Sequence, residues 1–136
     1  MKISKGVLEK MFAECNKKYF NSSLIMPNIS TYIGETSMGM FTVREGRYTR
    51  DMKISIARNF NLTIEELRDL LIHEMIHEYV YSKTGKVSHN RMFKNKMKEL
   101  NEKYGLDIRK NSKHLFRKYG NRKTLFQKLI SQYFNI

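Results

Sequence analysis

The spacing of apolar side chains along the chain predicts a helix, then the strands of a small sheet, and then further helices. From Val7 to Phe20 they fall near helical spacing, and Ser4 stands before them as a candidate N-cap. Three short runs rich in β-branched and aromatic residues then predict strands at 29–33, 39–43 and 52–56. The polar residues 44–51 are expected to join the last two strands as a hairpin.

The second half of the chain carries weaker helical patterns. An apolar stripe predicts a helix from about Asn90 to Tyr104, and Gly105 is well placed as its C-terminal stop. Asn121 could cap a further amphipathic helix that runs through Tyr133. The pattern assigns no element to residues 110–120.

The strongest helix signals lie between the predicted strands and the helix from about Asn90. Thr63 and Glu66 have the spacing of a capping box. The residues that follow, ELRDLLIHEMIHEYVY, are apolar on two flanks, which predicts a buried helix that ends before a loop at 82–88. His73 and His77 are polar residues in the middle of that buried helix, so they need a chemical reason to be there.

His73, Glu74 and His77 form an HExxH motif. Positions i and i+4 lie one turn apart on the same face of a helix, so both imidazoles can reach one tetrahedral metal ion. Glu74 is turned slightly around the helix, where its carboxylate can act on a metal-bound water instead of the metal. This is the arrangement of zinc hydrolases. The alternative is a pair of core histidines satisfied by hydrogen bonds.

A catalytic zinc needs a third protein ligand. The residues of the right chemistry that remain are two histidines and three glutamates: His89, His114, Glu78, Glu99 and Glu102. His89 stands at the predicted junction of loop and helix, where a short turn can fold it back onto the HExxH helix. His114 lies in the basic stretch KHLFRKYG, which favours a surface or nucleic-acid contact.

The order of these features resembles the SprT-like (Spartan-type) metalloprotease domain. The phrases that carry the resemblance span roughly residues 7–105; they are CNKKYFNSSL, GMFTV, MKISI, LLIHEMIHEYVY and SHNRMF. The resemblance implies one Zn²⁺ per chain, held by His73, His77 and His89. It also implies that Glu74 is the general base and proton shuttle.

The resemblance implies the architecture and activity as well. We expect an α+β, zincin-like single domain with an N-terminal helix, a small three-stranded sheet, the HExxH active-site helix and further C-terminal helices. Residues 1–109 would form the metallopeptidase domain and residues 110–136 a basic C-terminal extension packed on or next to it. The expected reaction is peptide-bond hydrolysis by a zinc-bound water. By analogy with other zincins, the protein or peptide substrate would add as a strand near Gly39–Val43.

Charge suggests a second kind of partner. The 136 residues hold 26 Lys and Arg against 13 Asp and Glu, and residues 83–136 carry 15 of the former and 3 of the latter. Such a segment can bind DNA phosphates, and single strands would be preferred if Phe116 and Tyr119 stack on bases. The densest basic cluster is Lys110, Lys113, Arg117, Lys118, Arg122 and Lys123. The alternative is that the aromatic rings pack on the core and the basic side chains are merely solvated.

Two other functions stay open from the sequence alone. In the first, the chain is a basic nucleic-acid-binding protein with a structural or inactive zinc site. A fourth protein ligand would close such a site, whereas an open fourth position favours catalysis. In the second, the chain is a peptidase whose third ligand is Glu99 or Glu102 in place of His89.

Cysteine content and hydropathy limit which structural classes and cellular locations fit the chain. The single cysteine excludes an intrachain disulfide and any cysteine-based zinc ribbon within the chain. No stretch approaches the roughly 18 apolar residues of a membrane span, and the first residues do not read as a signal peptide. We therefore expect a soluble, cytoplasmic protein with no membrane partner.

Overall fold

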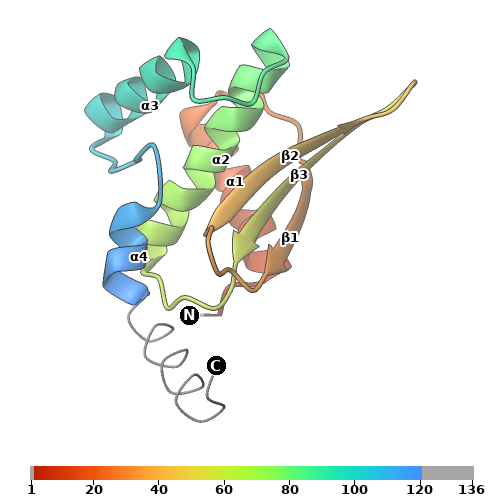
Figure 1. Ribbon diagram of the computed structural model, residues 1–136. Coiled ribbons are helices and arrows are strands. Elements are labelled where there is room, and N and C mark those ends of the chain that lie inside the picture. Colours follow the sequence, from red (N-terminus) through yellow and green to blue (C-terminus); the bar gives the residue numbers. More distant parts are fainter. Residues whose placement is uncertain (1, 121–136) are drawn as a thin grey trace.

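Four helices and three strands make up the part of the chain that the computed structural model describes, residues 2–120. Their arrangement is α+β, as predicted: a first helix, a small sheet, and then further helices (Figure 1). In chain order the elements are α1 (Lys5–Tyr19), β1 (Asn28–Tyr32), β2 (Gly39–Glu45), β3 (Arg50–Ala57), α2 (Ile64–Thr84), α3 (Arg91–Tyr104) and α4 (Lys113–Tyr119).

The sheet has the strand order β1-β3-β2, so β2 forms one of its edges. β1 runs parallel to β3, with Ile29 opposite Ile54, and β2 runs antiparallel to β3. The predicted hairpin connection at 44–51 is too long, because β2 and β3 pair as far as Glu45 opposite Arg50. Opposite charges face each other across these last pairs, which favours continuing the strands beyond their apolar part.

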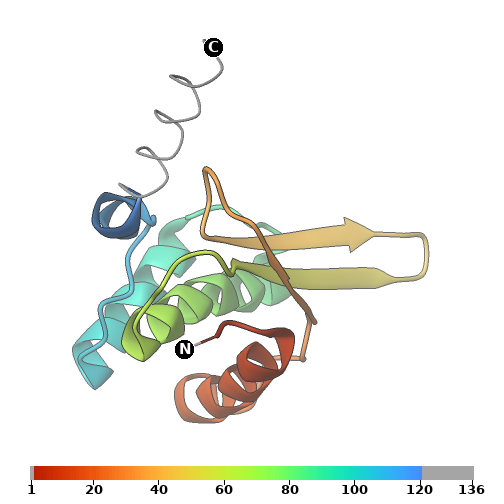
Figure 2. The same cartoon turned by 90° about the horizontal axis from the view of Figure 1, so that it is seen from below.

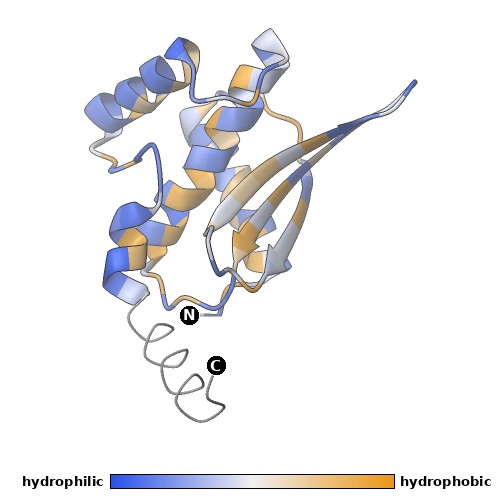
Figure 3. Cartoon of the chain, viewed as in Figure 1, coloured by the Kyte–Doolittle hydropathy of each residue, from blue (hydrophilic) through white to orange (hydrophobic). Residues whose placement is uncertain are grey.

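α2 occupies the centre of the molecule. Figures 1 and 2 show the sheet on one side of it and α3 on another, while the far end of the β2–β3 hairpin projects beyond the helices. α1 packs against β1 and α2 packs against β2. Leu67, Leu71 and Ile76 of α2 are fully buried, and the apolar stretches of α2 and the sheet lie next to each other (Figure 3). The edge strand β2 is therefore held beside the HExxH helix.

The ends of the helices follow from particular residues. The predicted capping box at α2 is present, since Thr63 Oγ1 accepts from the Glu66 N–H and the Glu66 carboxylate accepts from the Thr63 N–H. α2 continues past the predicted loop start at residue 82 and ends only at Gly85, whose φ of 72° is left-handed. Glycine takes this conformation without steric cost. Gly105 ends α3 in the same way, as predicted.

The stretch to which the pattern assigned no element contains α4. Leu115 of this helix is buried, and the ring of Phe116 packs edge-on against Phe60 with centroids 5.6 Å apart. α4 is short and has no side-chain N-cap, so it carries few sequence signals of its own. The helix predicted from Asn121 lies outside the described residues. None of the described helices is both long and apolar enough to cross a membrane.

Candidate metal centre

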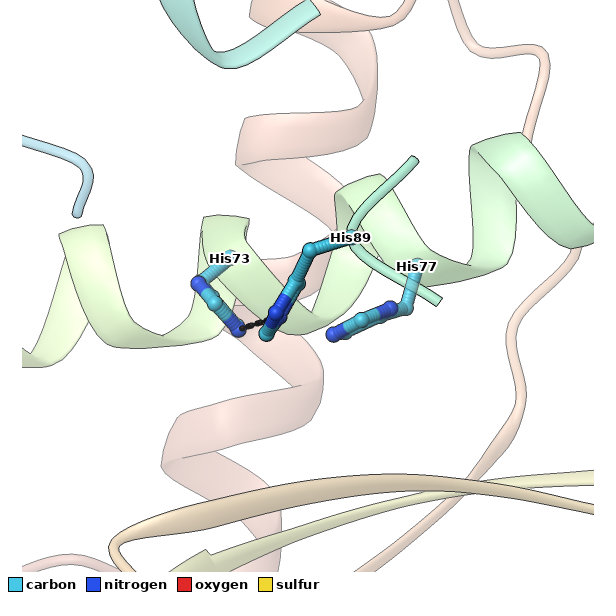
Figure 4. A group of neighbouring side chains, drawn as sticks. All are labelled: His73, His77 and His89. Carbon is cyan, nitrogen blue, oxygen red and sulfur yellow. Dashed lines mark hydrogen bonds between the residues drawn. The ribbon is translucent and has the colours of Figure 1, made fainter. Parts of the chain in front are cut away.

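Three histidines converge on one point beside α2 (Figure 4). His73 and His77 lie one turn apart on α2, while His89 reaches them from the loop before α3. That loop begins at the left-handed Gly85 and ends where the side chain of Asn90 caps α3 by accepting from the N–H of Phe93 at 3.0 Å. His89 directly precedes this cap, which anchors the chain on its C-terminal side.

The spacing of the ring nitrogens fits a metal ion. Nε2 of His73 and Nε2 of His89 are 3.3 Å apart, and the candidate ligand atoms of all three histidines lie within 4.8 Å of one another. Two nitrogens bound to a tetrahedral ion at ~2.05 Å would be ~3.3 Å apart. The three histidines could therefore hold a metal ion. No other His, Cys, Asp or Glu of residues 2–120 joins this group.

The surroundings keep the three imidazoles neutral. Burial, followed by the proximity of His89, lowers the pKa of His73 to about 4, and burial with both neighbouring histidines lowers the pKa of His77 to about 3. Burial also lowers the pKa of His89. Phe93 contributes to this dry environment, since its ring centroid lies 4.6 to 5.0 Å from those of all three histidines. Neutral imidazole is the form that binds metals.

A backbone carbonyl orients His73. Nδ1 of His73 lies 2.7 Å from the carbonyl oxygen of Arg109, and a carbonyl can only accept, so Nδ1 carries the proton. The lone pair of His73 is then on Nε2, which faces the other histidines. This contact could not be predicted from the sequence, because every residue type has a backbone carbonyl and the identity of Arg109 says nothing about the bond.

Glu74 lies at the edge of the sheet. Its side chain is only 4% exposed, and burial raises its pKa to about 8. Gly39, the first residue of β2, makes this position possible: a Cβ atom there would lie 2.7 Å from Glu74 Oε2. No local pattern points to this role of Gly39, because the close approach is between elements that lie far apart in the chain.

The other candidate ligands lie elsewhere. Glu78 is buried and accepts from the N–H of Ile25 at 3.1 Å. Glu99 and Glu102 extend from α3 with exposed side chains and pair with lysines of the same helix. His114 lines a small cavity of about 90 Å³ together with Asp69, Asp107 and His73. Of the five residues considered for the third position, the structure brings only His89 to His73 and His77.

Four of the six residues of the predicted basic cluster lie in the part of the chain that the structure describes. Lys110, Lys113 and Arg117 are exposed, whereas Lys118 pairs with Glu66 at 3.0 Å. The aromatic residues of the same helix, Phe116 and Tyr119, are half-buried against the core, which favours the packing alternative for them. The remaining two cluster members, Arg122 and Lys123, lie outside the described residues.

A comparison with protein families gives a match over most of the chain. The family model described as the SprT-like family matches residues 8–114, a span that includes all of the elements from β1 to α3 and the three histidines. A search of curated proteins found no match. Because the family model covers well over half of the chain, this protein belongs to the SprT-like family.

Proposed function

We propose that this protein is a zinc-dependent metallopeptidase. One observation carries the proposal: three neutral imidazoles converge beside the helix that also bears the buried Glu74, and residues 2–120 supply no fourth protein donor. A site of this composition leaves a coordination position for solvent or substrate, which is typical of catalytic zinc and not of structural zinc. It therefore favours hydrolysis over the alternative of a closed, structural site.

Zinc is the metal that suits this donor set. Imidazole nitrogen binds borderline divalent ions well, while the oxygen-rich surroundings preferred by magnesium or calcium are missing among the three donors. We assign His73, His77 and His89 as the ligands. When bound, zinc would supply Lewis acidity that polarises a peptide carbonyl and makes water easier to deprotonate.

Glu74 is proposed as the general base. It follows His73 directly on α2 but is not one of the grouped metal donors, so it is free to act on a metal-bound water. Burial raises the pKa of Glu74 to about 8, and a nearby dication would favour its ionised form. The carboxylate can then take a proton from the attacking water and return it to the leaving amine.

The edge strand β2 is the proposed seat of the substrate. β2 pairs with β3 on one side only, and Gly39 at its start lies against Glu74. An extended peptide could add to the free edge of β2 through main-chain hydrogen bonds. Such a peptide would run past the carboxyl group of Glu74.

The substitution Glu74→Gln tests this mechanism. We expect the variant to keep zinc and the fold but to cleave fluorescently labelled, denatured casein about 10²–10⁴-fold more slowly, because it lacks the general base. Glu65→Gln, an exposed change in the first turn of the same helix, is the matched control and should keep the parental rate. Equal cleavage by Glu74→Gln and the parent, with zinc bound in both, would refute the role of Glu74.

Association with DNA is a further part of the proposal. It is supported by the excess of basic residues in 83–136 and by the exposure of Lys110, Lys113 and Arg117. Binding to phosphates would bring the metal centre near DNA-bound protein substrates.

A further inference from the structure

A chain of hydrogen bonds leads from α3 to the metal centre. It begins at Asn101, whose side chain binds both backbone polar groups of Ile108: Nδ2 donates to the carbonyl oxygen at 2.8 Å, and Oδ1 accepts from the N–H at 2.8 Å. Ile108 is itself only 2% exposed. The backbone at this residue is therefore clamped to α3.

The next carbonyl along the chain is the one that orients His73. The Arg109 oxygen accepts from His73 Nδ1 at 2.7 Å, one residue after the clamp. We propose that Asn101 is a positioning residue for the metal centre, which holds the Arg109 carbonyl in place and thereby aims Nε2 of His73 at the metal. This inference rests on the proposed function in so far as His73 is a zinc ligand.

The other hydrogen bonds of residues 107–109 do not replace the clamp. The N–H of Asp107 reaches Asp69 Oδ2 only at 3.4 Å. The guanidinium of Arg109 bonds the carboxylate of Asp107, but both residues belong to the same segment and cannot anchor it. Apart from the His73–Arg109 bond itself, the two bonds from Asn101 are thus the shortest hydrogen bonds between this segment and a helix.

The location of Asn101 in α3 supports a role outside the helix. Asparagine is a weaker helix former than alanine, so its presence in the last turn costs helix stability. The carbonyl of Asn101 accepts from the N–H of Gly105, where the chain leaves α3, and its side chain then binds the returning backbone. In Figure 1 the connection between α3 and α4 bends toward α2 at this point.

The chain offers a matched control in Asn16. Its side chain makes the same pair of bonds to the backbone of Leu24, at 2.9 and 3.1 Å. The next residue, Ile25, donates its N–H to Glu78 of α2 and not to one of the three histidines. Replacing either asparagine removes the same two bonds, but only Asn101 is linked to His73.

Zinc affinity measured by competition with a chromophoric chelator tests the proposal. Loss of a partner that orients a metal-bound histidine typically weakens metal binding by about 10–100-fold. We expect that loss in Asn101→Ala and a change of less than about twofold in Asn16→Ala. Asn101→Asp, which keeps the acceptor for the Ile108 N–H, serves as the milder variant if alanine prevents folding. Equal affinities in the Asn101 and Asn16 variants would overturn the inference.

The metal-free protein supplies an independent readout. Nitrogen-15 NMR of the His73 ring should report a proton fixed on Nδ1 in the parent and in Asn16→Ala, and exchange between the two tautomers in the Asn101 variants. An unchanged His73 tautomer in folded Asn101→Ala would contradict the positioning role. Failure of the parent to bind zinc would instead contradict the proposed function, and the NMR comparison would still decide the role of Asn101.

Discussion

Gly39 affects the candidate site because glycine has no Cβ atom. The backbone of β2 passes so close to Glu74 that a Cβ atom would lie 2.7 Å from Oε2 and 3.3 Å from a methyl group of Ile56. The carboxylate is the nearer group and lies at the end of its side chain, so it is the group that would have to move. An alanine at residue 39 would therefore displace the Glu74 carboxylate from its observed position.

Gly39→Ala should lower peptide cleavage without releasing zinc. A displacement of about 1 Å in a reacting group can cost about 100-fold in rate, and none of the three atoms nearest to the added Cβ belongs to a metal donor. Gly6→Ala is the control, since nothing lies within 4 Å of its added Cβ. Steady-state cleavage of labelled casein and zinc content would be measured together; full activity in Gly39→Ala would show that Glu74 need not hold its observed position.

Single residues also show the limit of sequence reasoning. The spacing of His73 and His77 on a predicted helix was enough to place them on one face of α2. The resemblance to the family was needed to choose His89, since spacing alone left five candidates open. The Arg109 carbonyl and Gly39 act through backbone geometry between distant segments, which no local pattern encodes.

Among the elements, the link between α2 and α4 depends on Glu66. This carboxylate caps α2 and also accepts from Lys118 and from the hydroxyl of Tyr119 in α4. Burial by itself raises the pKa of Glu66, but these hydrogen bonds outweigh it and lower the pKa to about 2. The ionised form of Glu66 is therefore favoured by folding.

Low pH should weaken the link that Glu66 makes between α2 and α4, and it should do so over a defined pH range. Because the pKa of Glu66 is lower in the folded state, its contribution is complete above about pH 4.5 and is lost as the pH falls toward 2. We expect Glu66→Gln to lower the free energy of unfolding by about 1–3 kcal/mol at pH 6 and by much less at pH 3. Urea unfolding of parent and variant at both pH values measures this difference. A difference that stays constant with pH would contradict the role of the charge.

Helices and strands could be predicted from the sequence where residues close to their ends mark them. Capping residues marked the starts of α1 and α2, and a glycine stop marked the end of α3. The hairpin was misjudged because cross-strand charge pairs extend β2 and β3, and such pairs are visible only once the register is known. α4 was missed because it depends on packing by Leu115 and on Glu66 of another helix.

For the whole molecule, the uneven charge predicts salt-dependent binding to DNA. If Lys110, Lys113 and Arg117 contact phosphates, reversing all three to Glu should weaken binding to a labelled single strand. It should also flatten the log–log salt slope by about 0.7–0.9 per lost contact. Reversal of Lys2, Lys5 and Lys10, which are also exposed, gives the same change in net charge. Titrations at two salt concentrations compare them, and equal effects of the two triple variants would argue against a defined DNA surface.

X-ray absorption at the zinc edge of the zinc-loaded protein would show the coordination shell itself. We expect one zinc per chain, bound by three imidazole nitrogens and one oxygen from solvent, and the loss of one imidazole in His89→Ala. His114→Ala should leave the spectrum unchanged, since His114 is not among the three converging histidines. A shell of four protein ligands, or a spectrum that His89→Ala does not alter, would contradict a catalytic zinc site held by His73, His77 and His89.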